Sequence, residues 1–141
     1  MKEDKSKEVS ENTPESLVVA HKDLSKLSPL VYTDENIAEL TSQRGDDIKE
    51  ILDIDEIFCF THKRKGKWLV GYFKRVDDIT TLDKYSFEVS TSVVNANWTL
   101  TKSLMVYGDK ELLTEKIYTS SGLFTLAQNL ITSYTSELNV F

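Results

Sequence analysis

The sequence predicts an α+β fold, in which a β-hairpin at about residues 57–74 packs with a mainly helical C-terminal half and a flexible acidic arm comes first. Aromatic and β-branched residues fill two short runs around a turn that contains Gly66, which is typical of a hairpin. Apolar residues later in the chain recur at helical spacing. We divide the 141 residues into a disordered tail (1–15), an amphipathic arm (16–32) and a single small α+β domain (33–141).

The tail and the arm differ in their apolar content. Residues 1–15 hold only Met1 and Val9 as apolar side chains, too few to offset about 1–2 kcal/mol of backbone entropy per ordered residue. We therefore predict that the tail is disordered when free. Residues 16–28 place apolar groups along one helical face, and Pro29 ends that pattern. Two interpretations stay open for this segment: a detachable helix packed on the domain, or an arm that orders on a partner.

Two short helices are predicted before the hairpin. Thr33 or Asp34 has the side chain of a helix cap, and Gly45 is a typical residue just after a helix. A second helix is expected from Asp46 to Leu52, because acidic residues favour the first turn of a helix.

The hairpin is the clearest local signal in the sequence. Residues 57–62 read as one strand, residues 63–66 as the turn and residues 67–74 as the second strand. Gly66 supplies the positive φ that a tight connection needs. Two strands alone are marginally stable, so we expect helical cover or a third strand.

The C-terminal half reads mainly as helix, with one ambiguity. Residues 79–93 fit both helical and strand spacing, and periodicity alone does not decide between them. Residues 95–106 are predicted to form a helix that stops at Gly108, and residues 111–118 a loop or a single turn. Residues 120–138 carry the best amphipathic stripe of the chain.

Charge is distributed unevenly along the chain, which has a net charge of -6 and a pI of about 4.9. Residues 1–56 contain 7 basic and 15 acidic side chains, a balance of -8, whereas residues 57–75 contain 6 basic and no acidic ones. A chain with this net negative charge does not have the basic surface that is typical of a protein that binds nucleic acid or anionic membranes. The basic band fits lysines that protect a strand edge against unwanted pairing, and the acidic arm is a second option for covering it.

The residues that catalysis or metal binding would need are scarce. A single cysteine, Cys59, and two histidines, His21 and His62, do not make a zinc site of the usual kind. The five glycines are scattered singly, so no phosphate-binding loop is present. Cys59 lies between two phenylalanines and is predicted to be a small buried residue. We expect no enzymatic activity, no cofactor, no metal and no membrane-spanning segment.

Several motifs of the C-terminal two-thirds occur together in one family. A basic, aromatic strand at residues 67–75 is followed by VDDITTL at 76–82, LMVYGDKEL at 104–112 and TEKIY at 114–118. In this order of motifs, residues 57–138 resemble the tail-assembly-chaperone-like group of small structural-cluster proteins from tailed bacteriophages of gut bacteria. The resemblance implies a non-enzymatic, helix-rich α+β protein that acts in particle or tail morphogenesis. It also favours the helical alternative for residues 78–93.

The function expected from the sequence is therefore that of a bacteriophage structural or assembly protein. We expect it to bind other phage proteins in the host cytoplasm. Incorporation in the virion and formation of a homo-oligomer are both open. Aromatic and leucine anchors dominate such contacts, and the expected contact residues are Leu17, Leu24, Trp68, Tyr72 and Phe141. The alternative is an acidic inhibitor or immunity-type protein that masks a basic partner surface. A small enzyme with an unrecognised site is a third option.

Overall fold

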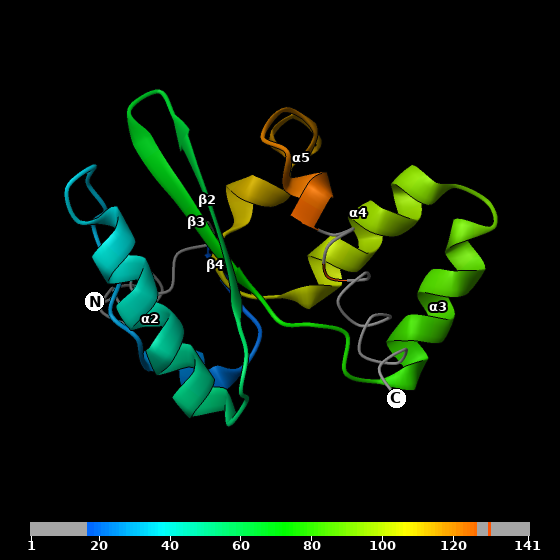
Figure 1. The fold of residues 1–141 in the computed structure, drawn as a ribbon, viewed down its shortest axis with the longest axis horizontal. Helices are drawn as coiled ribbons and strands as arrows, with labels where there is room; N and C mark the ends of the chain where they lie inside the picture. Colours follow the sequence, from blue (N-terminus) through cyan, green and yellow to red (C-terminus); the bar gives the residue numbers. More distant parts are fainter. Residues whose placement is uncertain (1–16, 127–129, 131–141) are drawn as a thin grey trace, which may run out of the picture.

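A four-stranded antiparallel sheet organises the chain, and helices cover both of its faces (Figure 1). Its strands lie in the order β1 (Leu17–Val19), β4 (Met105–Asp109), β3 (Lys67–Phe73) and β2 (Phe58–Arg64). This computed structural model describes residues 17–126 and residue 130. The predicted α+β class is confirmed. The predicted tail over residues 1–15 lies outside the described residues.

The predicted hairpin is confirmed. Strand β2 (Phe58–Arg64) pairs with strand β3 (Lys67–Phe73), and the register runs from Phe58↔Phe73 to Arg64↔Lys67. Lys65 and Gly66 form the connection with φ values of 53° and 78°. Two successive residues with positive φ match the twist of the two strands, which is why a two-residue connection closes them.

Strand β4 (Met105–Asp109) lies between β1 and β3, where Tyr107 pairs with Tyr72. The predicted helix over residues 95–106 is confirmed for residues 95–104, because α4 spans Val93–Leu104 and is capped by Ser92. It is wrong from Met105 onward. Residues 105–108 are all buried, and a short run of this kind suits a strand that is covered on both faces.

The predicted helix over residues 16–28 is wrong. Strand β1 (Leu17–Val19) pairs with β4 through Val18↔Gly108, and a short 3-10 helix, η1 (Lys22–Lys26), follows it. A run of Leu, Val and Val fits a pleated surface, and β4 offers it an open edge. Leu24 in η1 has no exposed surface. The predicted arm therefore contributes a strand and a core residue to the fold from residue 17 onward.

The predicted break at Gly45 is also wrong, because one helix, α2, runs from Ile37 to Leu52. A single glycine inside a helix costs only about 1 kcal/mol relative to alanine. Here it lets the helix approach the sheet, since an added Cβ would lie 3.5 Å from Ile57 Cγ2 and 3.7 Å from Tyr72 Cε2. Before the helix, Thr33 Oγ1 accepts a hydrogen bond from the backbone N–H of Asn36 at 3.2 Å.

The region that fitted both helix and strand is helical. Helix α3 (Ile79–Val89) has Asp78 as its N-cap, and the Asp78 carboxylate accepts a hydrogen bond from the Thr81 N–H at 2.8 Å. The predicted loop or turn over 111–118 contains two short helices, η2 (Lys110–Leu113) and α5 (Glu115–Ser120). Residues 123–126 are helical, and the remainder of the predicted 120–138 helix, apart from residue 130, lies outside the described residues.

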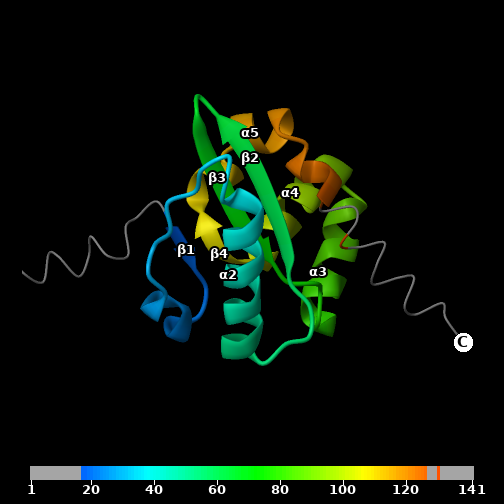
Figure 2. The ribbon, with the colours of Figure 1, turned by 60° about the vertical axis from the view of Figure 1, so that its left-hand side comes forward.

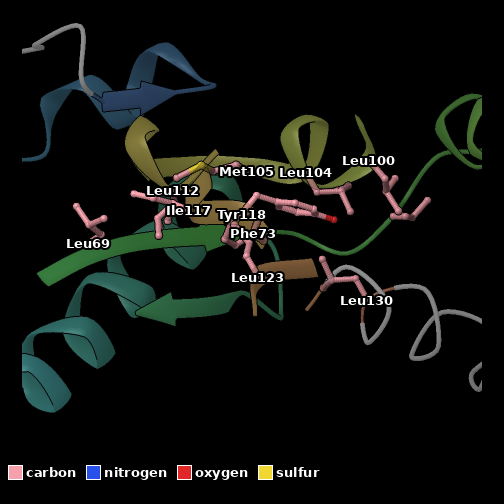
Figure 3. Close-up of a cluster of buried hydrophobic side chains, with 11 residues drawn as sticks. Leu69, Phe73, Leu100, Leu104, Met105, Leu112, Ile117, Tyr118, Leu123 and Leu130 are labelled. Carbon is pink, nitrogen blue, oxygen red and sulfur yellow. The ribbon is translucent and has the colours of Figure 1, made fainter. Parts of the chain in front are cut away.

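Two buried clusters divide the core between the two faces of the sheet, because neighbouring residues of a strand point to opposite faces. The first cluster packs one face of β3 against α4, η2 and α5 (Figure 3), and it contains Leu69, Phe73, Val76, Leu100, Leu104, Met105, Leu112, Ile117, Tyr118, Leu123 and Leu130. The second packs the other face against α2 and η1, and it contains Leu24, Ile48, Val70, Tyr72, Val106 and Tyr107.

A search of the described part of the chain finds no helix with both the length and the apolar character needed to cross a bilayer.

Candidate functional site

A groove with a volume of about 410 Å³ lies on the α2 side of the sheet. The segment that leads into α2 forms one wall and rises past β1 toward the hairpin (Figure 2). Strand β3 and the end of β4 form the other walls of the groove. We call this feature the Trp68 groove, and its lining residues are Leu17, Pro29, Leu30, Val31, Tyr32, Arg44, Gly66, Lys67, Trp68, Val70, Tyr72, Tyr107, Gly108 and Asp109.

The Asp34 carboxylate ties the wall before α2 to the hairpin. Oδ1 accepts from the Trp68 indole N–H at 2.8 Å, and both carboxylate oxygens lie 2.8 Å from Lys63 Nζ. The Lys63 ammonium also lies 5.8 Å from the centre of the Trp68 ring. Hydrogen bonds from Lys63 and then Trp68 lower the pKa of Asp34. Trp68 is therefore held in place from two sides by residues of different elements.

A buried arginine lies at the bottom of the groove. The Arg44 side chain is only 6% exposed; its Nη2 donates to the Ser28 carbonyl oxygen at 2.8 Å and its Nη1 to the Tyr107 hydroxyl at 3.3 Å. Asp47 Oδ2 lies 3.7 Å from Arg44 Nε. Among the residues that the structure describes, Nε has no hydrogen-bond partner.

Three tyrosines, Tyr32, Tyr72 and Tyr107, line the groove together with Arg44. Tyr72 donates to the Thr41 carbonyl oxygen at 2.9 Å, and its ring centre is 6.5 Å from that of Tyr107. Burial raises the pKa of Tyr107, and the Arg44 charge opposes that rise. Burial likewise raises the pKa of Tyr32, against a hydrogen bond with Tyr72 and the Arg44 charge. All three phenols are thus neutral near pH 7 and serve as hydrogen-bonding groups, not as bases.

Asp109 brings a carboxylate to the wall formed by β4. Its Oδ2 accepts from the Val70 N–H at 2.8 Å. Desolvation raises the pKa of Asp109, while the Val70 hydrogen bond and the nearby Lys67 charge lower it. The groove therefore combines apolar walls with a buried cation and a partly buried carboxylate.

The five expected contact residues differ in where the structure places them. Leu17, Trp68 and Tyr72 all line the groove, although Tyr72 is only 1% exposed and so forms part of its floor. Leu24 is wrong as a contact residue, because it is fully buried in the second cluster under α2. Phe141 lies outside the described residues.

Sequence reasoning missed Arg44 as a site residue, and a signal for it was present. Ile37, Leu40, Ile48 and Ile51 recur at spacings of three and four with Arg44 among them, so a charged residue interrupts the apolar stripe of one helix. Tyr32, Tyr107 and Asp34 carried no comparable signal, because their role depends on contacts between distant segments.

A second exposed feature lies on the opposite side of the molecule. Helix α3 contains no buried residue, and its Ile79 and Phe87 are 78% and 77% exposed; Val94, at the start of α4, is 69% exposed. A hollow of about 250 Å³ lies between α3 and α4, next to Tyr85 and Leu100.

Residues that could support chemistry are dispersed. In the part of the chain with described coordinates, no group of three or more His, Cys, Asp or Glu side chains is arranged to hold a metal ion. The prediction that Cys59 is buried is wrong, because this residue is exposed on edge strand β2. Its thiol is nonetheless desolvated, which against a hydrogen bond with Tyr72 raises its pKa to about 11.

Comparison with protein-family models, with curated proteins and with solved structures gives no match for this chain. The resemblance to the phage tail-assembly-chaperone-like group therefore stays a prediction.

Proposed function

We propose that this chain is a non-enzymatic bacteriophage structural or assembly protein that acts by binding other phage proteins. The observation that supports this most is the Trp68 groove, in which Leu17, Trp68 and Tyr72 come together. The proposal places the protein in the host cytoplasm during morphogenesis and allows for its incorporation in the virion.

The composition of the groove supports protein binding. Tryptophan, tyrosine and arginine are the residues that most often dominate the binding energy of protein interfaces, in pockets that exclude water. The groove offers all three within one concave surface. Because Asp34 holds the Trp68 indole, a partner would meet a side chain that is already ordered, which lowers the entropy lost on binding.

The exposed apolar residues of α3 support the same function from another direction. They lie on the other side of the sheet from α2 (Figure 1). A protein with two separate binding surfaces can join two neighbours, which is what an assembly factor or a structural subunit has to do.

Purification of tagged chain from cells infected with a phage that encodes it tests this proposal. We expect other phage structural proteins to co-purify with the wild-type chain, and their recovery to fall about tenfold or more with Trp68→Ala, as for the loss of an interface anchor. Phe124→Ala removes an aromatic side chain that is 43% exposed and lies outside the groove, so it is the matched control. Far-UV circular dichroism checks that both variants fold. Failure of every phage protein to co-purify with the wild-type chain contradicts the proposal.

The acidic-inhibitor alternative is favoured by one specific observation. The carboxylates along α2 and around its ends are exposed, namely those of Glu35, Glu39, Asp46, Asp47, Glu50, Asp53, Asp55 and Glu56. A complex led by these charges would weaken steeply between about 0.05 and 0.5 M salt, whereas docking in the groove, through apolar contacts and the buried Arg44, would change much less. Measuring the dissociation constant of the captured partner across that range separates the two functions.

A further inference from the structure

Arg44 is a groove residue with hydrogen-bond donors that the described part of the chain does not use. A guanidinium carries five N–H donors, and in the described residues hydrogen bonds from Arg44 reach two neutral oxygens, the Ser28 carbonyl and the Tyr107 hydroxyl. Its Nε is buried without a hydrogen-bond partner. A buried donor in this state carries its full desolvation penalty, and Arg44 lines the groove, so an acceptor that reaches the guanidinium would gain more here than at a surface lysine.

The charge of Arg44 is only partly compensated. Within the described part of the chain, Asp47 is the carboxylate within 4 Å, at 3.7 Å from Nε, and its side chain is 53% exposed. A long contact to a solvated carboxylate offsets little of the energy needed to bury a cation. The Tyr107 ring, 5.7 Å from the guanidinium carbon, adds a modest attraction. The bottom of the groove is therefore suited to an anion.

We propose that the Trp68 groove recognises a segment of a partner protein that presents one carboxylate next to an aromatic or large apolar side chain, with the carboxylate seated on Arg44. This inference rests on the proposed protein-binding function and adds the chemistry of the partner to it. The apolar side chain lies against the groove wall formed by Leu17, Leu30 and Trp68.

The other charged residues of the groove favour a single negative charge. Asp109 lines the groove and Asp47 lies beside the guanidinium, so two carboxylates oppose a dianion such as a phosphate monoester. Lys67 lines the same wall as Asp109 and lies close enough to lower its pKa. Of the two cations that line the groove, Arg44 and Lys67, Arg44 is the one whose planar fork matches the two oxygens of a carboxylate.

Capped tetrapeptides test this inference on the unmodified chain. One has a Glu-Phe centre, a second has Gln-Phe, and a third has phosphoserine-Phe. We expect the Glu peptide to bind at least about tenfold more tightly than its neutral Gln counterpart, as for a hydrogen bond to a buried charged group. Isothermal titration calorimetry measures the affinities. Equal affinity for the Glu and Gln peptides, or tighter binding of the phosphoserine peptide, overturns the inference.

A nuclear magnetic resonance experiment locates the carboxylate. The chain has three arginines, Arg44, Arg64 and Arg75, so their Nε–H signals are few and can be assigned by substitution. We expect the Glu peptide to shift the Arg44 Nε–H signal and the Trp68 indole N–H signal together. A selective shift at Arg64 or Arg75 with no change at Arg44 overturns the assignment of the anchor.

A free organic acid, N-acetylphenylalanine, tests whether the ligand is a protein segment. If its affinity equals that of the Glu peptide, the choice of a protein segment as the ligand is overturned.

Substitutions provide the second readout. Arg44→Gln should abolish the preference for Glu over Gln, and Arg64→Gln should preserve it, because Arg64 pairs with Glu111 outside the groove. Should Arg44→Gln not fold, the peptide pair on the wild-type chain still decides. The proposed function is judged separately by co-purification: phage proteins that co-purify while neither peptide binds would overturn the carboxylate inference alone.

Discussion

At the scale of single residues, the Asp34 carboxylate connects the segment before α2 with the hairpin through Lys63 and Trp68. Asp34→Asn should release this connection, because a neutral amide loses the ion pair with Lys63. We expect the Trp68 indole N–H signal in a nuclear magnetic resonance spectrum to move toward the position of a solvated indole. Asp46→Asn is the control, since within residues 17–126 Asp46 pairs with Lys49 on the same helix.

The same contact sets a pH dependence. The pKa of Asp34 is lowered in the folded chain, so the ionised contact is fully present above the ordinary carboxyl pKa of about 3.9 and is lost as the pH falls through the lowered value. The Trp68 indole signal of the wild-type chain should therefore stay constant from neutral pH down to that range and then move. A signal that moves between pH 7 and 5 would contradict this assignment.

Cys59 supports a second prediction at this scale. The residue is exposed, so a reagent can reach it, but its pKa of about 11 keeps the thiolate scarce at neutral pH. Alkylation by iodoacetamide near pH 8 should be on the order of 100-fold slower in the folded chain than in urea, because the thiolate is the reacting form. The rate should rise about tenfold per pH unit up to pH 10. Equal rates in the folded and unfolded chain would show that the thiol is not perturbed.

At the scale of elements, alanine substitution should have opposite effects on stability at two glycines, Gly108 and Gly45. Gly108 in β4 has a φ of 137°, and an added Cβ would lie 2.4 Å from the Val70 carbonyl oxygen. Gly108→Ala should therefore lower the free energy of unfolding by about 2–5 kcal/mol, from backbone strain and from overpacking. Gly45→Ala should instead be neutral or raise it by up to about 1 kcal/mol, because alanine favours a helix and its Cβ finds ordinary contacts.

Urea denaturation followed by circular dichroism measures both changes. The pair is internally controlled, since each variant adds one methyl group to a buried glycine. A Gly108→Ala chain as stable as the wild type would contradict the close approach of β4 to β3.

The elements that the sequence predicted well are those whose partners are close in the chain. The β2–β3 hairpin needs only two alternating runs and a turn with positive φ, all within residues 58–73. Strand β1 needs β4 as its partner, and the register Val18↔Gly108 joins segments that no local pattern relates. Helical spacing in residues 16–28 was a weaker determinant than that distant edge.

The groove shows the same division. Trp68 and Tyr72 could be chosen as contact residues because large aromatic side chains dominate interfaces. Their meeting with Leu17 depends on the pairing of β1 with β4, which the sequence did not predict. Arg44 could have been noticed, because it interrupts the apolar face of α2, but only the structure shows that it lies under a groove.

At the scale of the whole molecule, residues 17–26, which form β1 and η1, are an integral part of the fold. Leu24 is fully buried against the second cluster, whereas Val31, seven residues later, is 82% exposed. Leu24→Ala should lower the free energy of unfolding by about 2–5 kcal/mol, and Val31→Ala should change it by less than about 0.5 kcal/mol.

Thermal or urea unfolding followed by tryptophan fluorescence and by far-UV circular dichroism measures this difference. The two probes should give coincident transitions, as for one cooperative unit. A detachable N-terminal segment would instead leave the stability of the Leu24→Ala chain unchanged, and that result would contradict the packing described above.

The position of β1 has a consequence for the birth of the protein on the ribosome. Val18 is synthesised 90 residues before its strand partner Gly108 (108 minus 18). At about 5–20 residues per second, the nascent β1 waits roughly 5 to 20 s before β4 exists. Throughout that interval the Leu-Val-Val run and the Leu24 side chain are without their native cover. Residues 17–24 therefore have to stay unpaired, without aggregating, until β4 has been translated.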